Sequence, residues 1–272
     1  MEDLFEKISE IKAEIELQLN ISVPLWFGIS GDMGDATITN AEIASGLPRM
    51  IDHTLLRPDA GSGEIERLCD DAKKYGFYSV CVYSPFTRLC RERLEDSDVK
   101  VCSVAGFPSG AFLSKVKAFE AREAVRQGAD EIDLVINISA LKENNLALAY
   151  DDIRDVVKAV SDDTVVKVIL ETGYLTEDEK IKACLLAQIA GANFVKTSTG
   201  FGPSGATVED VKLMRAVVGP DTGVKAAGGI RDAARAISMV KAGATRIGTS
   251  ASINIMTGLV RMTGPNCMRR GN

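Results

Sequence analysis

The feature that most constrains the fold is a regular alternation that begins at about residue 48. Short segments rich in β-branched residues alternate with longer amphipathic segments, a pattern typical of repeated βα units around a parallel sheet. We expect strands at residues 50–54, 78–84, 99–107, 131–137, 165–172, 193–199, 223–229 and 246–252. Eight strands separated by helices predict a (β/α)8 barrel, also called a TIM barrel.

A short internal repeat supports the barrel. Gly128, Gly191 and Gly243 each precede an alanine and stand two or three residues before an expected strand. Glycine at that place supplies the left-handed cap that ends a helix and turns the chain back toward the sheet. A doubly wound open sheet is the competing architecture, but no GxGxxG motif follows the first strand.

The 272 residues fit one barrel domain, residues 48–272, preceded by an extension, residues 1–47. Apolar residues recur at helical spacing between residues 2 and 19; they are Leu4, Phe5, Ile8, Ile11, Ile15 and Leu19. We expect this helix to pack on the bottom or flank of the barrel, with partner binding as the alternative. Pro24, Gly28, Gly31 and Gly34 indicate a linking loop, followed by a short helix near residues 39–45.

Composition excludes several classes of protein. A net charge of −6 and the lack of a basic run argue against nucleic-acid binding. One histidine, His53, cannot build a zinc site with two or three imidazole ligands. The six cysteines form no CxxC pair, which argues against a disulfide framework. An acidic N-terminus and the absence of an 18-residue apolar run predict a cytoplasmic protein that does not enter membranes.

Five ionisable residues lie inside expected strands, although strands of a parallel barrel are usually apolar on both faces. They are Asp52, Asp133, Lys167, Lys196 and Lys225. Apolar neighbours flank each one and should face the helices, so all five should face the barrel lumen. A buried ion-pair network without a catalytic role is one interpretation. The excess of lysines favours another, in which one amine loses its proton near neutral pH and attacks a carbonyl group.

Lys196 and Lys225 lie on consecutive expected strands, where the charge of one amine favours the neutral form of the other. This arrangement suits Schiff-base formation. Small residues follow these strands and the eighth, at places where barrels bind phosphate through backbone N–H groups. The candidate phosphate ligands are Thr199, Gly200, Gly228, Gly229, Gly248 and Ser250, with Arg231 either a further ligand or a solvated cation. These features predict a phosphorylated carbonyl substrate.

Five segments resemble deoxyribose-phosphate aldolase, over about residues 48–255: IDHTLL (51–56), ADEID (129–133), KVILET (167–172), KTSTGF (196–201) and VKAAGGIR (224–231). The resemblance implies a class I aldolase, free of metal and cofactor. This enzyme reversibly cleaves 2-deoxy-D-ribose 5-phosphate to acetaldehyde and D-glyceraldehyde 3-phosphate. It assigns the Schiff base to Lys196, its activation and proton sharing to Lys225, and proton transfer to Asp133. Asp52, Lys167 and Cys81 match supporting positions, although the context of Cys81 alone indicates a buried apolar thiol.

Two features depart from the resembled family. Some members end in a tyrosine that assists proton transfer, whereas no tyrosine follows Tyr174 here, which leaves deprotonation to Asp133 and water. Ser250 is followed by Ala251 where two serines are frequent, so one phosphate contact would be missing. A non-catalytic phosphosugar-binding barrel is the alternative from another class, and an isomerase or lyase barrel of amino-acid biosynthesis is a further one. The sequence leaves open whether the chain forms a dimer or a tetramer.

Overall fold

A closed barrel of eight parallel strands forms the centre of the molecule. The computed structural model describes residues 2–24 and 39–263. The strands follow the chain order around the barrel, and the last pairs with the first. They are β1 (Ile51–Leu55), β2 (Ser79–Val82), β3 (Lys100–Ala105), β4 (Glu131–Val135), β5 (Val165–Ile169), β6 (Phe194–Lys196), β7 (Gly223–Ala227) and β8 (Arg246–Thr249). The predicted (β/α)8 barrel is confirmed, and closure of the sheet excludes the doubly wound alternative.

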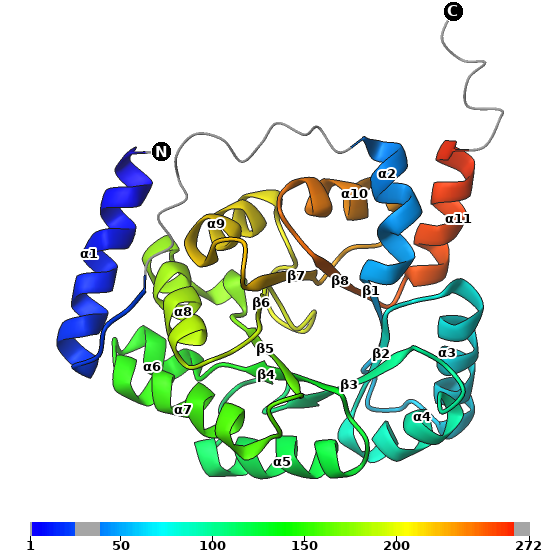
Figure 1. Ribbon diagram of the computed structural model, residues 1–272, viewed down its shortest axis with the longest axis horizontal. Coiled ribbons are helices and arrows are strands. Elements are labelled where there is room, and N and C mark those ends of the chain that lie inside the picture. Colours follow the sequence, from blue (N-terminus) through cyan, green and yellow to red (C-terminus); the bar gives the residue numbers. More distant parts are fainter. Residues whose placement is uncertain (1, 25–38, 264–272) are drawn as a thin grey trace, which may run out of the picture.

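Helices surround the strands (Figure 1). They are α3 (Ser62–Tyr75), α4 (Thr87–Arg93), α5 (Ser114–Arg126), α6 (Ile138–Lys142), α7 (Leu146–Ala159), α8 (Glu177–Ile189), α9 (Val208–Val218), α10 (Ala233–Lys241) and α11 (Ser252–Thr263). Side chains of Thr176, Thr207 and Asp232 accept backbone hydrogen bonds at the starts of α8, α9 and α10, which stabilises those helix ends. The sequence pattern did not single out α4.

Most strands are shorter at their carboxyl ends than the sequence pattern predicts. The segment expected to continue to Thr199 leaves the sheet after Lys196, and the one expected to continue to Gly229 leaves it after Ala227. Gly200, Gly228 and Gly229 have φ values of +89°, +94° and +72°, which no strand residue adopts. The apolar and small residues beyond each strand therefore form the mouth of the barrel.

The glycines of the internal repeat have left-handed backbones, as predicted. Gly128 and Gly243 have φ values of +104° and +111°. A Cβ at either position would lie 2.8 Å from the Cγ atom of Arg91 or Arg215, respectively. Each arginine also donates from Nε to the carbonyl of its glycine, at 2.9 and 3.1 Å. Glycine is thus needed at both positions for backbone conformation and for close packing.

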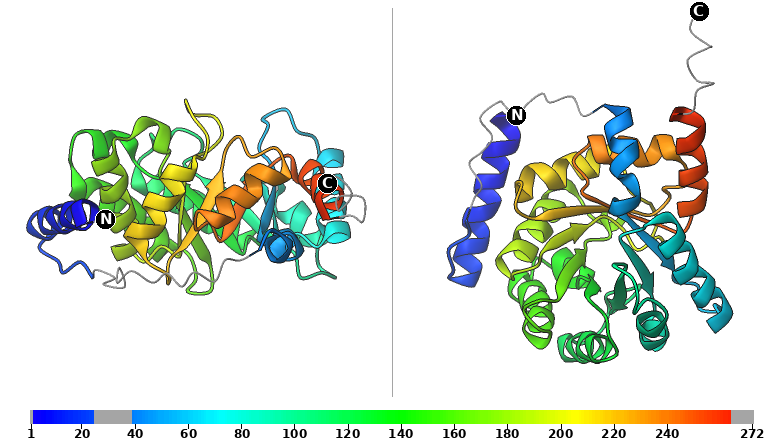
Figure 2. Two further views of the ribbon diagram at one scale, coloured as in Figure 1. Left: turned by 90° about the horizontal axis from the view of Figure 1, so that it is seen from above. Right: turned by 45° about the vertical axis from the view of Figure 1, so that its right-hand side comes forward.

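The predicted N-terminal helix is present as α1 (Glu2–Leu19) and lies on the flank of the barrel beside α8 (Figures 1 and 2). Its buried residues are Ile8, Ile11 and Ile15. Ion pairs from Lys7 to Glu177, at 2.9 Å, and from Lys182 to Glu14, at 2.8 Å, flank the contact. The apolar helix α8 is therefore covered on the side away from the strands as well as on the side facing them.

A short helix precedes the first strand, at the end of the barrel where the strands begin. α2 (Asn40–Gly46) and the 3-10 helix η1 (Leu47–Met50) precede β1, and Figure 2 shows α2 at the face opposite the loop after β6. The linker glycines Gly28, Gly31 and Gly34, together with Cys267 and residues 268–272, lie outside the described residues. In the part of the chain that the structure describes, no helix is long and apolar enough to cross a membrane.

Candidate active site

The lumen of the barrel holds all five ionisable residues that the strand pattern placed there. Asp52, Asp133, Lys167 and Lys225 are fully buried, and Lys196 is 3% exposed. Strand alternation explains this placement for Asp133, Lys167 and Lys225, which have buried apolar neighbours on both sides. Asp52 and Lys196 have such a neighbour on one side only, since His53 and Thr197 follow them. The sequence prediction of a charged lumen is therefore confirmed.

Asp133 is the centre of this charge network. Its Oδ2 accepts hydrogen bonds from Lys196 Nζ and Lys225 Nζ, both at 2.7 Å. Its Oδ1 accepts from Lys167 Nζ at 2.8 Å. Lys225 is also paired with Asp52. The two lysines on adjacent strands thus share one carboxylate oxygen, and their Cα atoms are partners in the β6–β7 register.

Two further charged residues complete the network and were missed in the sequence. Glu131 lies 2.8 Å from Lys167 Nζ, and Arg246 contacts Asp52 at 2.8 Å and Glu131 at 3.0 Å. The guanidinium of Arg246 stacks 3.6 Å from the ring centroid of Tyr78. Both residues begin a strand, where a charged residue is ordinary. Period-two spacing could have identified Glu131, since it stands two residues before Asp133.

Neighbouring charges determine the ionisation states of Asp133 and Lys225. Burial disfavours ionisation of Asp133, but the three lysines outweigh it and hold the pKa of Asp133 well below its usual range. Burial likewise disfavours the ammonium form of Lys225, but Asp133 and Asp52 outweigh it and raise the pKa of Lys225 above its ordinary value. Asp133 is therefore a carboxylate and Lys225 an ammonium near neutral pH.

A cleft of about 560 Å³ opens above Lys196 at the carboxyl ends of the strands. Of the seven charged network residues, Lys196 alone lines this cleft. The loops after β6, β7 and β8 form much of its wall. Together with Gly248 at the end of β8, they contribute every candidate phosphate ligand predicted from the sequence: Thr199, Gly200, Gly228, Gly229, Gly248 and Ser250. Arg231 also lines the cleft.

The glycines of the cleft differ in what surrounds them. At Gly229 a Cβ would meet nothing within 4 Å, so its backbone is open to the cleft. At Gly248 a Cβ would lie 2.9 Å from the Cε atom of Lys225. Gly248 therefore makes room for the buried lysine, whereas Gly229 leaves its backbone open to a bound group.

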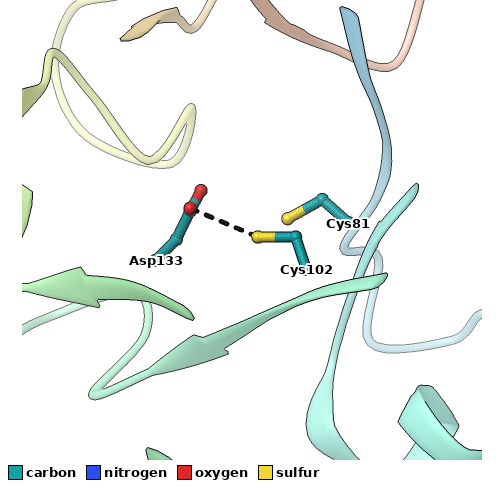
Figure 3. Close-up of side chains that lie close together, drawn as sticks. All are labelled: Cys81, Cys102 and Asp133. Carbon is teal, nitrogen blue, oxygen red and sulfur yellow. Dashed lines mark hydrogen bonds between the residues drawn. The ribbon is translucent and has the colours of Figure 1, made fainter. Parts of the chain in front are cut away.

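Cys81, Cys102 and Asp133 place one potential metal-ligating atom each within 4.8 Å of one another (Figure 3). Cys102 donates to Asp133 Oδ1 at 3.2 Å and accepts from Lys167 Nζ at 3.3 Å. The ammonium groups of Lys167 and Lys225 already contact the carboxylate, so a cation at this place would meet positive charge. The donor set does not fit a metal ion. Cys81 lies beside the network but does not line the cleft.

His53, which the sequence analysis used only to exclude zinc, lines the cleft. Its Nδ1 lies 2.9 Å from Ser252 Oγ. Burial lowers the pKa of His53 to about 4, so the ring is neutral near pH 7.

Known proteins resemble this chain over most of its length. The family model described as DeoC/LacD family aldolase matches residues 49–260. A relative named deoxyribose-phosphate aldolase from Thermoanaerobacter sp. (strain X514) is 58% identical over 212 residues, which cover 77% of this chain and 95% of the relative. One named deoxyribose-phosphate aldolase 1 from Bacillus licheniformis is 56% identical over 213 residues, 78% of this chain and 96% of the relative.

Solved structures give the same result. The tetrameric deoxyribose phosphate aldolase from Aeropyrum pernix superposes with a TM-score of 0.74 at 35% identity, over 79% of this chain and 91% of that one. A structure from Coccidioides immitis has a TM-score of 0.79 at 38% identity, over 92% of this chain and 96% of that one. The resemblance drawn from five sequence segments is confirmed: the chain belongs to the DeoC/LacD family of aldolases.

Proposed function

We propose that this aldolase cleaves 2-deoxy-D-ribose 5-phosphate reversibly to acetaldehyde and D-glyceraldehyde 3-phosphate through a Schiff base on Lys196. The observation that carries the proposal is the position of Lys196, which alone of the seven network residues lines the cleft. It combines access to a substrate with contact to Asp133 at 2.7 Å. Lys167 and Lys225 are fully buried below it and cannot meet a substrate in the cleft.

The reaction begins when the neutral amine of Lys196 adds to the C1 aldehyde of the open-chain sugar. Loss of water gives a protonated iminium, which is the electron sink. Removal of the proton from the C3 hydroxyl then forms the new aldehyde, while the electrons of the C2–C3 bond move toward the iminium and leave an enamine. Protonation of the enamine at C2 and hydrolysis by water release acetaldehyde and regenerate Lys196.

Asp133 and Lys225 supply the proton transfers in this proposal. The Asp133 carboxylate contacts the Lys196 nitrogen, so it can accept and return protons at that nitrogen and at the neighbouring carbon. The Lys225 ammonium donates a hydrogen bond to the same carboxylate oxygen, so Lys225 can exchange a proton with Asp133. Asp52 and Lys167 support this arrangement by contacting Lys225 and Asp133, respectively.

The phosphate is assigned to the loops after β6, β7 and β8. Gly229 offers an open backbone to the cleft, and Ser250 stands two residues before the start of α11. Backbone N–H groups in such a place bind anions, with Arg231 as a nearby cation. Binding energy from this remote group holds the C1 carbonyl against Lys196.

Trapping with borohydride tests the assignment of the nucleophile. Reduction in the presence of acetaldehyde should add one ethyl group to the protein, and peptide mass spectrometry should locate it on Lys196. Lys196→Leu should lose the adduct and the activity but keep the fold, because leucine retains apolar packing at a buried position. An adduct on Lys167 or Lys225 with Lys196 unmodified would contradict the proposal. A catalytically silent phosphosugar-binding barrel would give no adduct at all.

The division of the chain into an N-terminal extension, residues 1–47, and a barrel domain, residues 48–272, is also proposed here; within the described residues it is supported by α1, which covers α8. The five described cysteines are free and buried, which fits a reducing cytoplasm. A homo-oligomer is supported by exposed apolar side chains at the start of α5, namely Phe112, Leu113, Val116 and Phe119. Sedimentation of the full chain distinguishes a monomer from a dimer or tetramer.

A further inference from the structure

A buried carboxylate outside the lumen network lies next to the cleft. Glu171 follows β5 and is 1% exposed. Its backbone is left-handed, with φ +56° and ψ +61°, a conformation that is unfavourable for a non-glycine residue. The folded protein keeps this backbone conformation only if the contacts of the residue stabilise it. The contacts of Glu171 therefore indicate its role.

Glu171 holds the turn that forms one wall of the cleft. Its Oε2 accepts hydrogen bonds from the backbone N–H of Thr199, at 3.1 Å, and from the Thr199 hydroxyl. The same hydroxyl oxygen accepts from the backbone N–H of Phe201 at 3.0 Å. Gly200, between them, has a left-handed backbone. One carboxylate oxygen thus fixes a three-residue turn whose members all line the cleft.

The other carboxylate oxygen lies against the backbone of Gly202. Glu171 Oε1 is buried and has no hydrogen-bond partner among the described residues. Glu171 also lines a second cavity, of about 340 Å³, with Tyr174 and Pro108 in its wall. A Cβ at Gly202 would lie 2.6 Å from the Glu171 Cδ atom, so the backbone packs directly on the carboxylate. Burial raises the pKa of Glu171, and the hydrogen bonds from Thr199 oppose this shift.

We propose that Glu171 is a positioning residue that sets specificity for the phosphorylated substrate by fixing the Thr199–Phe201 turn. It touches no reacting atom. It occupies the N–H of Thr199 and, through the Thr199 hydroxyl, that of Phe201, which leaves the Gly200 N–H between them for the phosphate. Its loss therefore weakens phosphate binding while the chemistry at Lys196 continues. The proposal rests on the proposed function, because it uses the phosphate pocket assigned there.

Kinetics on two substrates test this role. kcat and KM are measured with 2-deoxyribose 5-phosphate and with unphosphorylated 2-deoxyribose for the parent, Glu171→Ala, Glu171→Gln and Thr199→Val. Tyr174→Phe is the matched control, since Tyr174 lines the same cavity and its side chain makes no hydrogen bond to the turn within the described residues. Circular dichroism and thermal unfolding establish that each variant is folded.

Glu171→Ala should raise KM for the phosphorylated sugar about tenfold or more, as for loss of a hydrogen bond to a charged group. It should leave kcat/KM for the free sugar within about threefold. Glu171→Gln should recover most of the loss, because the amide oxygen still accepts from Thr199. Thr199→Val should produce a smaller rise in the same KM and add little to the effect of Glu171→Ala. Tyr174→Phe should match the parent.

Three results would overturn the proposal. Equal losses on both sugars in Glu171→Ala would indicate a general structural role, and unchanged kinetics in a folded Glu171→Ala would indicate no role. If Glu171→Ala does not fold, an unchanged phosphate preference in Thr199→Val is decisive. In each case the parent still prefers the phosphorylated sugar, so the proposed function stands. A parent without that preference would instead refute the phosphate assignment, and the positioning role with it.

Discussion

Replacing Asp133 with asparagine separates a proton carrier from a counter-ion. The substitution retains shape and removes one negative charge from a carboxylate that three lysine Nζ atoms contact at 2.7–2.8 Å. Breaking a fully buried ion pair costs about 3–5 kcal/mol. For a protein of this size each kcal/mol lowers Tm by about 2–4 °C, so we expect a fall of about 6–20 °C.

The sign of the pH dependence follows from the lowered pKa of Asp133. A carboxylate whose pKa is depressed in the folded state stabilises the protein above its unfolded pKa of about 3.9. That stability is lost as pH falls below this value toward the folded pKa. The stability difference between the parent and Asp133→Asn should therefore be full at pH 6–7 and shrink below about pH 4.

Catalysis should be affected independently of stability. If Asp133 carries the proton, exchange of the acetaldehyde methyl hydrogens for deuterium in heavy water should slow by about 10²–10⁴-fold in Asp133→Asn. Asp152→Asn is the control, because Asp152 forms a fully buried pair with Lys117 at 2.7 Å, outside the lumen. It should lose stability and keep the exchange rate. Exchange at the parent rate in Asp133→Asn would refute the proton-carrier role and leave Asp133 as a counter-ion.

Three further predictions concern the activation of Lys196, the phosphate pocket and the effect of removing metal ions. Lys225→Leu should lower kcat and move the acidic limb of the rate–pH profile upward by about 1 pH unit, because the ammonium beside Lys196 is lost; an unchanged profile would show that the two amines are uncoupled. Gly229→Ala should raise KM for the phosphorylated sugar about tenfold, whereas Gly76→Ala, also left-handed with open space around it, should not; equal KM values in both variants would contradict a phosphate role for Gly229. Activity should survive EDTA, because the iminium is the electron sink, and inactivation that zinc reverses would refute the Schiff-base mechanism.

The strand positions were predictable because the hydrophobic alternation that buries a barrel strand is local. The same alternation placed Asp133 and Lys196 in the lumen. When the residues next to a charged residue face the helices, its own side chain must face the lumen. It did not identify Arg246, whose stacking on Tyr78 depends on strands far apart in the chain. The sequence also could not tell that Cys102 bonds to Asp133, since a thiol in an apolar strand is as often a packing residue.

Glu171 illustrates a different limit. It belongs to the KVILET segment, and the strand predicted there includes it, yet its left-handed backbone ends the strand. The conformation is fixed by Thr199, 28 residues later in the chain. A local sequence pattern cannot predict a contact with a residue so far along the chain. The sequence therefore predicts Glu171 only as the end of a strand, although it shapes the cleft.

The signs of the lumen charges divide the barrel into two halves. The acids Asp52, Glu131 and Asp133 come from β1 and β4, whereas the cations Lys167, Lys196, Lys225 and Arg246 come from β5, β6, β7 and β8. Each half-barrel alone would carry three or four like charges on the concave face that it must bury, without partners. Asp133 pairs with Lys167 between adjacent β4 and β5, but Asp52 meets Lys225 and Arg246 only when β8 pairs with β1. Complete neutralisation of the lumen therefore requires the closed barrel, which also brings the proton carriers together.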